Sequence, residues 1–274
     1  MRLYRPVQPP ALQYEPMPVH YRYREYLPCK SLQNYIACYW TVDSWEVGTN
    51  HWNRVIPDGC VDIIFDLRAP SFSKGAFVSG LMRSFQIMPV TGHQSLLGIR
   101  FFSETAHHFL RYPVSGVTGE RLFLEELWGM EASWIVEYLM EATEIADKIA
   151  MMEDVLKQRL SASQSRSDRL LVTSIRYMYE YRGNMSISSL AEKVNYSERN
   201  LRRTFQNELG VSPKELIRII QFQSLLQELT RGTHVSFMDL ALQYGYYDQS
   251  HVIKSFQTLY GVAPSLIFPA RKAK

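Results

Sequence analysis

The chain has 274 residues, of which 46% are hydrophobic and 21% are charged, and its formal net charge is +3 at pH 7. This composition is typical of a soluble globular protein with two cores, and the lack of any apolar run of eighteen residues excludes a membrane-spanning helix. The amino terminus has no apolar signal core and the three cysteines have no CxxC spacing, so we expect a cytoplasmic protein with reduced thiols.

Residues 1–20 contain five prolines and little apolar periodicity, which predicts an extended arm. Over residues 21–120, short runs of aromatic and β-branched residues alternate with turn residues, which indicates the strands of a β-barrel or sandwich. Within this region, Pro57-Asp58-Gly59 separates runs at 54–56 and 61–67, and this pattern predicts a β-hairpin.

A small barrel can enclose a ligand, and its lining is expected to combine aromatic rings with a few polar groups. The candidates for an effector pocket are Tyr39, Trp40, Trp52, Arg54, Asp62, Phe65 and Arg100. The alternative for each of them is that the aromatic ring fills the core and the charge faces water. The sequence leaves both interpretations open.

From Arg121 the chain runs to Pro213 without a proline, and apolar residues recur three and four apart between 135 and 156. This seam predicts a helical connector over residues 121–160. It fits either a helix or helix pair that covers the β-rich domain, or a homodimer interface through residues 131–160. Residues 161–167, SASQSRS, have almost no apolar side chains and are predicted to be a linker.

An internal repeat organises residues 168–274, because the pattern that starts at Leu190 starts again at Leu240, about 50 residues later. Each copy has a Leu-Ala pair, a turn, a polar cap, apolar residues four apart and a final Gly-Val-x-Pro. Asn195 and Gly245 stand in the turns, where the backbone is expected to need a positive φ. A helix, a tight turn and an exposed second helix form the helix-turn-helix that enters the DNA major groove.

The free face of each second helix carries side chains that suit DNA. Arginine can bind guanine through two hydrogen bonds, Gln and Asn can pair with adenine, and Lys and Ser can hold phosphate. The residues predicted to contact DNA are Ser197, Arg199, Asn200, Arg202, Arg203 and Gln206 in the first copy and Gln249, Ser250, His251 and Lys254 in the second. An ordinary solvated face is the alternative for either helix alone, and the repeat argues against it.

The segments 197–205, 210–213, 245–252 and 261–264 resemble the DNA-binding domain of the AraC/XylS transcription regulators. The resemblance implies seven helices, a joining helix over 213–229, and two recognition helices one DNA turn, ~34 Å, apart. Lys254 stands where relatives more often have Arg, so sharper sequence reading is expected from the first unit. Residues 54–65 more loosely resemble the cupin-like sensory domains that precede this DNA-binding domain in many such regulators.

The sequence therefore predicts an α+β protein with a cupin-like amino-terminal β-barrel or sandwich, a helical connector and an all-α domain with two helix-turn-helix units. The predicted function is a sequence-specific transcription regulator that binds double-stranded DNA, responds to a small molecule or partner, and contacts RNA polymerase. The alternative is a helical protein-interaction module that controls transcription without reading bases. We expect no catalytic site, metal or cofactor, since no P-loop, GxSxG motif or helical zinc pair occurs.

Overall fold

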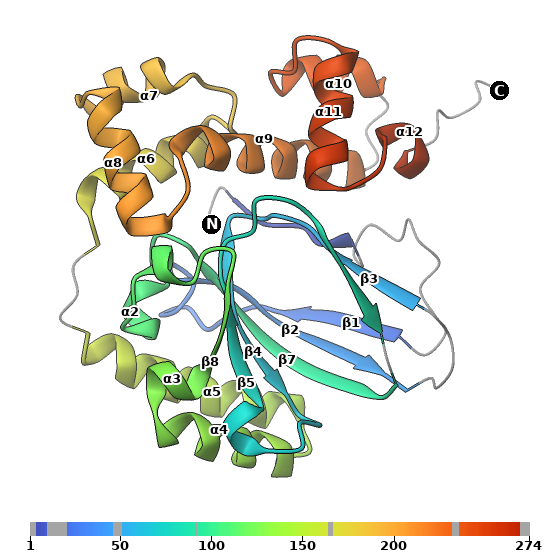
Figure 1. The fold of residues 1–274 in the computed structure, drawn as a ribbon, viewed down its shortest axis with the longest axis vertical. Coiled ribbons are helices and arrows are strands. Elements are labelled where there is room, and N and C mark those ends of the chain that lie inside the picture. The colour runs from blue at the N-terminus through green and yellow to red at the C-terminus, as the bar shows by residue number, and fades with distance from the viewer. Residues whose placement is uncertain are drawn as a thin grey trace.

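The computed structural model describes residues 4–9, 21–45, 51–90, 92–163, 167–231 and 236–268. A β-rich amino-terminal part lies below a helical carboxy-terminal part, with further helices packed beside the sheet (Figure 1). This arrangement confirms the predicted α+β architecture with an amino-terminal β-rich domain and a carboxy-terminal helical domain.

Within the described residues, two antiparallel sheets form the amino-terminal part. The larger sheet has the order β1-β2-β7-β4-β5-β8, and the smaller one pairs β3 with β6. The strands are β1 (Tyr21–Tyr26), β2 (Ile36–Ser44), β3 (His51–Val55), β4 (Cys60–Asp66), β5 (Ala76–Ser79), β6 (Gln86–Val90), β7 (Gln94–Phe102) and β8 (Arg121–Phe123).

The predicted hairpin between residues 54–56 and 61–67 is wrong. β3 pairs with β6, and β4 lies between β7 and β5 in the other sheet. Both edges of β4 are therefore occupied by longer-range partners, and the segment at Asp58 carries the chain from one sheet to the other.

Successive residues of a strand point to opposite faces, and the two faces of the larger sheet have different surroundings. One face carries Tyr39, Ile63, Phe65, Ile99 and Phe101, all fully buried in one hydrophobic cluster. Helices cover this face (Figure 1): α3 (Leu124–Trp128), α4 (Met130–Glu141) and α5 (Ile145–Ser161). The short helices η1 (Phe72–Lys74), α2 (His107–Leu110) and η2 (Val114–Gly116) complete this part.

The apolar seam between residues 135 and 156 is divided between α4 and α5, because residues 142–144 are not helical. Lys148 on α5 donates to the carbonyl oxygens of Leu139 and Ala142, so a side chain from the second helix satisfies the end of the first. Met152 is buried under the sheet, whereas Tyr138 is 47% exposed. The helix pair packs on the β-rich part, and the dimer interface stays a prediction.

Over residues 167–231 and 236–268, seven helices follow, as the resemblance implies. They are α6 (Arg169–Glu180), α7 (Ile187–Val194), α8 (Glu198–Leu209), α9 (Pro213–Thr230), α10 (Phe237–Gln243), α11 (Gln249–Leu259) and α12 (Pro264–Ile267). The start of α9 has local causes: Pro213 occupies its first turn, and Ser212 forms a capping box with Glu215.

The two helix-turn-helix units belong to different hydrophobic clusters. Leu201 and Phe205 of the first unit share a cluster with the sheet core, whereas Val252 and Phe256 of the second unit pack with the end of α9. From the β-rich part, the fully buried residue that joins the second cluster is Ile56. The first unit is thus continuous with the amino-terminal core, and the second is attached over a smaller area.

Candidate nucleic-acid interface and interior cavity

Both turns of the helix-turn-helix units adopt the backbone conformation that their residues favour. Asn195 has φ of 57° and Gly245 has φ of 82°, in the left-handed region that Asn and Gly tolerate best. The second helices then begin on side-chain caps, because Ser197 accepts from the Asn200 amide at 3.3 Å and Asp248 from the His251 amide at 2.7 Å. The repeat seen in the sequence is therefore a repeat of local structure.

In the first unit, α8 has one buried and one open face. Leu201, Phe205 and Leu209 are buried, and the open face carries four exposed side chains, namely Arg199, Arg202, Arg203 and Gln206. Ser197 is exposed at the cap and Asn200 is half-buried. Arg202 pairs with Glu198 at 2.7 Å, but both side chains are solvent-exposed, so this ion pair is weak enough to exchange for a ligand.

In the second unit, α11 repeats this arrangement with a weaker charge. Gln249, Ser250 and Lys254 are exposed, whereas His251 is half-buried. The His251 ring stacks on Tyr247, with ring centroids 5.5 Å apart, so it is held against the turn. The structure brings the candidate DNA contacts of each unit onto one helix and its cap, but it leaves His251 less accessible than its neighbours.

Two aromatic residues of this surface were missed by the sequence reasoning. Tyr196 is 52% exposed and Tyr247 is 86% exposed, and each stands between the turn and the cap of its unit. Their shared place in the two copies is the signal that could have identified them. A tyrosine hydroxyl at such a turn is able to donate to a phosphate oxygen.

The joining helix sets the distance between the two units. α9 has 18 residues, which gives a length of ~27 Å at 1.5 Å per residue. The pair α7–α8 stands at one end of α9 and the pair α10–α11 at the other (Figure 1). The predicted separation of one DNA turn stays a prediction, and the length of α9 is of the same order.

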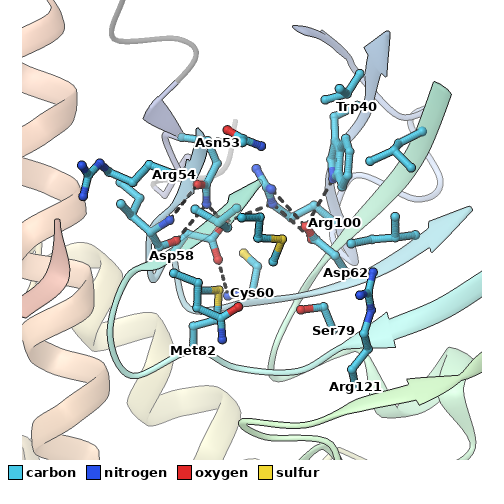
Figure 2. Close-up of a pocket in the computed structure, with 18 of the residues that line it drawn as sticks. Trp40, Asn53, Arg54, Asp58, Cys60, Asp62, Ser79, Met82, Arg100 and Arg121 are labelled. Atoms are coloured by element: carbon cyan, nitrogen blue, oxygen red, sulfur yellow. Dashed lines mark hydrogen bonds and ion pairs between the residues drawn. The ribbon is translucent and has the colours of Figure 1, made fainter. Parts of the chain in front are cut away.

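A cavity of about 400 Å³ lies between the second face of the larger sheet and the β3–β6 pair. Much of its lining is apolar, with side chains such as Val42, Ile64, Met82, Met88 and Leu96. Its polar centre is Arg100, which lies between Asp58 and Asp62 in Figure 2. The cavity is thus an apolar chamber with one buried charged cluster.

Arg100 binds both carboxylates. Its Nε lies 3.1 Å from Asp62 Oδ1 and 3.1 Å from Asp58 Oδ2, and its Nη2 lies 3.0 Å from Asp62 Oδ2. Its side chain is 4% exposed, and its Nη1 is buried without a hydrogen-bond partner among the described residues. One N–H-bearing nitrogen of a buried guanidinium is therefore unsatisfied.

A glycine makes this cluster possible. Trp40 on β2 donates from Nε1 to Asp62 Oδ2 on β4 at 3.2 Å, although β7 lies between these two strands. The residue of β7 that pairs with Trp40 is Gly98, where an added Cβ would lie only 2.0 Å from the indole ring. The indole crosses β7 because Gly98 has no side chain.

The charges of the cluster shift each other's protonation. Burial, together with the neighbouring Asp58, raises the pKa of Asp62 to about 6 in spite of its contact with Arg100. Burial alone disfavours the charged guanidinium, but the carboxylates of Asp62 and Asp58 raise the pKa of Arg100 above its ordinary value. Arg100 is therefore a permanent cation, and Asp62 is the group whose charge changes near neutral pH.

Of the seven residues predicted for the pocket, Trp40, Arg54, Asp62 and Arg100 line this cavity. Tyr39 and Phe65 do not, because strand alternation places them on the opposite face, in the core under the helices. Trp52 is 57% exposed and is not part of the lining.

Sequence reasoning also missed lining residues. The alternation that connects Asp62 to Cys60 and Ile64 could have identified those two, whereas Gln8 reaches the cavity through partners far along the chain. Gln8 donates to Asp58 Oδ2 at 2.7 Å and to the Ile56 carbonyl at 3.0 Å. The predicted arm thus contributes to the cavity in its described part, residues 4–9, and its residues 10–20 lie outside the described structure.

The first unit is held by side chains of the β-rich part. Arg83 donates to the Gly210 carbonyl, and its Nε lies 3.4 Å from Glu215 Oε1 at the start of α9. Thr118 donates to the Leu209 carbonyl at 2.6 Å. These contacts fix the carboxy-terminal end of α8.

The second unit is held by Arg54. This residue lines the cavity and donates from Nη1 to the Tyr260 carbonyl oxygen at 2.5 Å, just beyond α11. In Figure 2 its guanidinium points away from Arg100. One side chain therefore joins the cavity wall to the second helix-turn-helix unit.

No group of three or more His, Cys, Asp or Glu side chains with metal-binding geometry occurs in the described ranges. Cys29, Cys38 and Cys60 are free thiols. Among the described residues, the helices are too short or too polar to span a bilayer.

Comparison with known proteins identifies the helical part. Residues 190–268, which include both turns and both exposed helices, match a family described as a helix-turn-helix domain. The carboxy-terminal domain is an AraC-type helix-turn-helix domain. Residues 24–123, which form most of the β-rich part and its cavity, match a domain of unknown function, DUF6597.

Curated relatives of the AraC-type domain are regulators. An uncharacterized HTH-type transcriptional regulator of Haemophilus influenzae is 30% identical over 97 residues, which are 35% of this chain and 32% of that protein. Regulatory protein HrpB of Ralstonia nicotianae is 25% identical over 114 residues, which are 41% of this chain and 23% of that protein. The matched region therefore spans about a quarter to a third of these relatives.

Among solved structures, ToxT of Vibrio cholerae is similar over most of the chain. The similarity covers 90% of this chain and 97% of that one, with 14% identity and a TM-score of 0.43.

Proposed function

We propose that the protein is a sequence-specific DNA-binding transcription regulator. The observation that carries the proposal is the duplicated exposed face on α8 and α11, one set on each end of α9. Arg199, Arg202 and Arg203 offer guanidinium groups to base edges and phosphates, and α11 offers Gln249 and Lys254. One protomer would place both helices in successive major grooves on one side of the duplex.

The cavity supplies a route for control. We infer that an effector bound there changes how firmly Arg54 holds the second unit, while Arg83 and Thr118 keep the first unit fixed. An effector acts only if it binds two states of the protein with different affinity. The attachment of the second unit through few side chains makes it the part whose position the cavity is able to bias.

A homodimer through residues 131–160 is a second proposal, and a stripe on α4 favours it. Met130, Trp134 and Tyr138 are spaced four apart and are 66%, 63% and 47% exposed. A row of large apolar side chains at this spacing suits a second copy of the same helix. Sedimentation analysis of a Trp134→Glu variant tests it: a shift from dimer to monomer is expected, and a wild-type monomer contradicts the proposal.

RNA polymerase contact, a cytoplasmic location and the absence of catalysis stay expectations.

A protein-interaction module that does not read bases is the competing function, and its prediction differs in salt dependence. Each phosphate contact releases counterions, so duplex binding weakens steeply with salt, whereas a protein partner need not show this slope.

The test starts with duplexes that the wild-type protein selects from a random pool. Fluorescence anisotropy then compares wild type with Arg202→Ala/Arg203→Ala, and with Arg22→Ala/Arg24→Ala as a control of equal charge change on exposed sites of β1. Loss of each good base contact should cost about 1–3 kcal/mol, and the control should bind as wild type does. Failure to select any sequence, or equal affinity of the first variant, contradicts the proposal.

A further inference from the structure

The cavity contains two buried polar atoms that have no partner among the described residues. One is Nη1 of Arg100, and the other is the hydroxyl of Tyr21, which also lines the cavity. Leaving a buried donor unsatisfied is unfavourable, and in folded proteins such groups mark a missing hydrogen-bond partner. Because Nη1 can only donate, the partner that it lacks is an acceptor.

The four carboxylate oxygens beside Arg100 already have donors. Asp58 accepts from the Cys60 amide and Gln8 as well as Arg100, and Asp62 accepts from Trp40 and Arg100. A cationic ligand would therefore find no carboxylate oxygen here that lacks a hydrogen-bond donor. It would also face the free N–H of a guanidinium, which repels it.

An anionic ligand is disfavoured for the opposite reason. With both carboxylates ionised, the cluster of Arg100, Asp58 and Asp62 has a formal charge of −1. A carboxylate placed on Nη1 would lie beside two others among buried side chains, where like charges repel more strongly than in bulk water. Of the other charged residues of the lining, Glu120 and Arg121 cancel formally, and Arg54 directs its guanidinium to Tyr260, away from Arg100 (Figure 2).

The rest of the lining favours hydrocarbon. Val42, Ile64 and Leu96 present apolar side chains from three strands of the sheet, and Phe77 adds an aromatic ring. A volume of about 400 Å³ lies in the range of sites that bury a small organic molecule. The site is therefore apolar with one point that needs an acceptor.

We propose that the cavity binds an uncharged amphipathic small molecule through a carbonyl or hydroxyl oxygen that accepts a hydrogen bond from Nη1 of Arg100. This inference rests on the proposed function, since it names the chemical class of the effector. The apolar part of the molecule lies along Ile64 and Leu96. The Tyr21 hydroxyl offers a second polar contact, for a ligand with a second oxygen.

Three probes with the same alkyl chain and different head groups test the chemistry at pH 7.5. Decanamide is neutral with a carbonyl acceptor, decanoate is an anion, and decylamine is a cation. Each competes with Nile red, a neutral dye with a carbonyl oxygen, for the full-length protein. Decanamide should displace the dye at a concentration about tenfold lower than either charged probe, because decylamine has no acceptor for Nη1 and decanoate is repelled by Asp58 and Asp62.

Two substitutions locate the binding. Leu96→Trp fills the cavity and should abolish dye binding, whereas Leu242→Trp, at a position on α10 that is 51% exposed, should leave it unchanged. Arg100→Lys keeps the charge and removes Nη1, so it should weaken decanamide binding about tenfold. If Arg100→Lys does not fold, the head-group series and the Leu96→Trp result still decide the inference.

The outcomes separate this inference from the regulator proposal. Equal or better competition by decanoate or decylamine overturns the uncharged ligand, and dye binding that survives Leu96→Trp overturns the site. If either happens while wild type still binds its selected duplex, the regulator proposal stands. If the protein does not recognise DNA but still binds decanamide as expected, the regulator proposal fails and the uncharged ligand in this cavity stands.

Discussion

Nη1 of Arg54 on β3 donates a hydrogen bond to the main-chain oxygen of Tyr260 at 2.5 Å. Tyr260 directly follows α11, so a positive charge stands at the negative end of that helix dipole. The same guanidinium lies 5.3 Å from the ring centroid of Phe85 and 5.2 Å from that of Tyr260. Because Arg54 also lines the cavity, a ligand there would contact the side chain that holds the second helix-turn-helix unit.

Replacing Arg54 with Met is therefore expected to loosen the second unit more than the first. The hydrogen bond to Tyr260 and the cation–aromatic contacts are lost, while Arg83 and Thr118 still hold the end of α8. Hydrogen exchange followed by mass spectrometry should show faster amide exchange in α11 and little change in α8.

The matched control is Arg24→Met, which removes an exposed arginine from β1. It should change exchange in neither recognition helix. Equal acceleration of α8 and α11 in the Arg54 variant would show that Arg54 supports the whole fold and does not control the second unit.

The two units are expected to contribute differently to DNA recognition. Arg203 on α8 can bind guanine with two hydrogen bonds, whereas Lys254 on α11 is a point charge. Arg203→Ala should cost about 1–3 kcal/mol and relax base preference within one half of the selected site. Lys254→Ala should weaken binding similarly for all sequences and reduce the salt slope by about one.

Repeating the selection from random duplexes with each variant distinguishes these effects. Arg203→Ala should yield sites that have lost information at one or two positions, and Lys254→Ala should yield the wild-type site. A relaxed base preference in the Lys254 variant alone would contradict the assignment of sharper reading to the first unit.

Gln223 on α9 is expected to be a strong link between the two parts of the chain. It is fully buried, accepts from the Val7 amide at 2.8 Å, and donates to the carbonyl oxygens of Val7 and Pro57 at 3.1 and 2.8 Å. Gln223→Leu removes all three hydrogen bonds at once. The free energy of unfolding, measured with urea, should fall by at least about 2 kcal/mol, because each buried group without a partner costs about 1–3 kcal/mol.

Gln227 supplies the comparison one turn later on α9. Its Nε2 is buried without a partner among the described residues, so Gln227→Leu removes an unsatisfied group and should change stability little or raise it. Equal losses in the two variants would mean that helix packing, and not the link to Val7 and Pro57, determines the effect.

The carboxy-terminal helices could be predicted from sequence because their signals are local. Ser197, Ser212 and Asp248 cap helices within three residues of their own positions, and Asn195 adopts the left-handed conformation that it tolerates. The repeat also predicted which face of each second helix is exposed, because apolar residues four apart mark the buried face and the exposed face lies opposite.

The β-rich part could be predicted only as a class, because several of its pairings, such as β2 with β7 and β3 with β6, are distant along the chain. β3 pairs with β6 and not with the neighbouring β4, and no local signal records this. The break between α4 and α5 has no proline or glycine, and a lysine from the next helix stabilises it. For the cavity, alternation alone could have separated Trp40 from Tyr39, but the role of Gly98 needed the register of three strands.

The pKa of Asp62 leads to the last prediction. Its pKa is raised by burial to about 6 in the folded protein, above the ordinary value of 3.8, so folding favours the protonated form. The stabilisation from this group is complete below the unfolded-state pKa and is lost as the pH rises through about 6. Asp62→Asn is neutral at every pH and cannot show this loss.

Urea denaturation at pH 5.0 and 7.5 measures the effect. The stability of wild type relative to Asp62→Asn should decrease by on the order of 1 kcal/mol between these two pH values. Asp154→Asn, at a side chain that is 73% exposed, controls for the loss of one carboxylate and should show no such trend. A relative stability of wild type that rises with pH would mean that the attraction of Arg100 outweighs burial, and that Asp62 is ionised throughout.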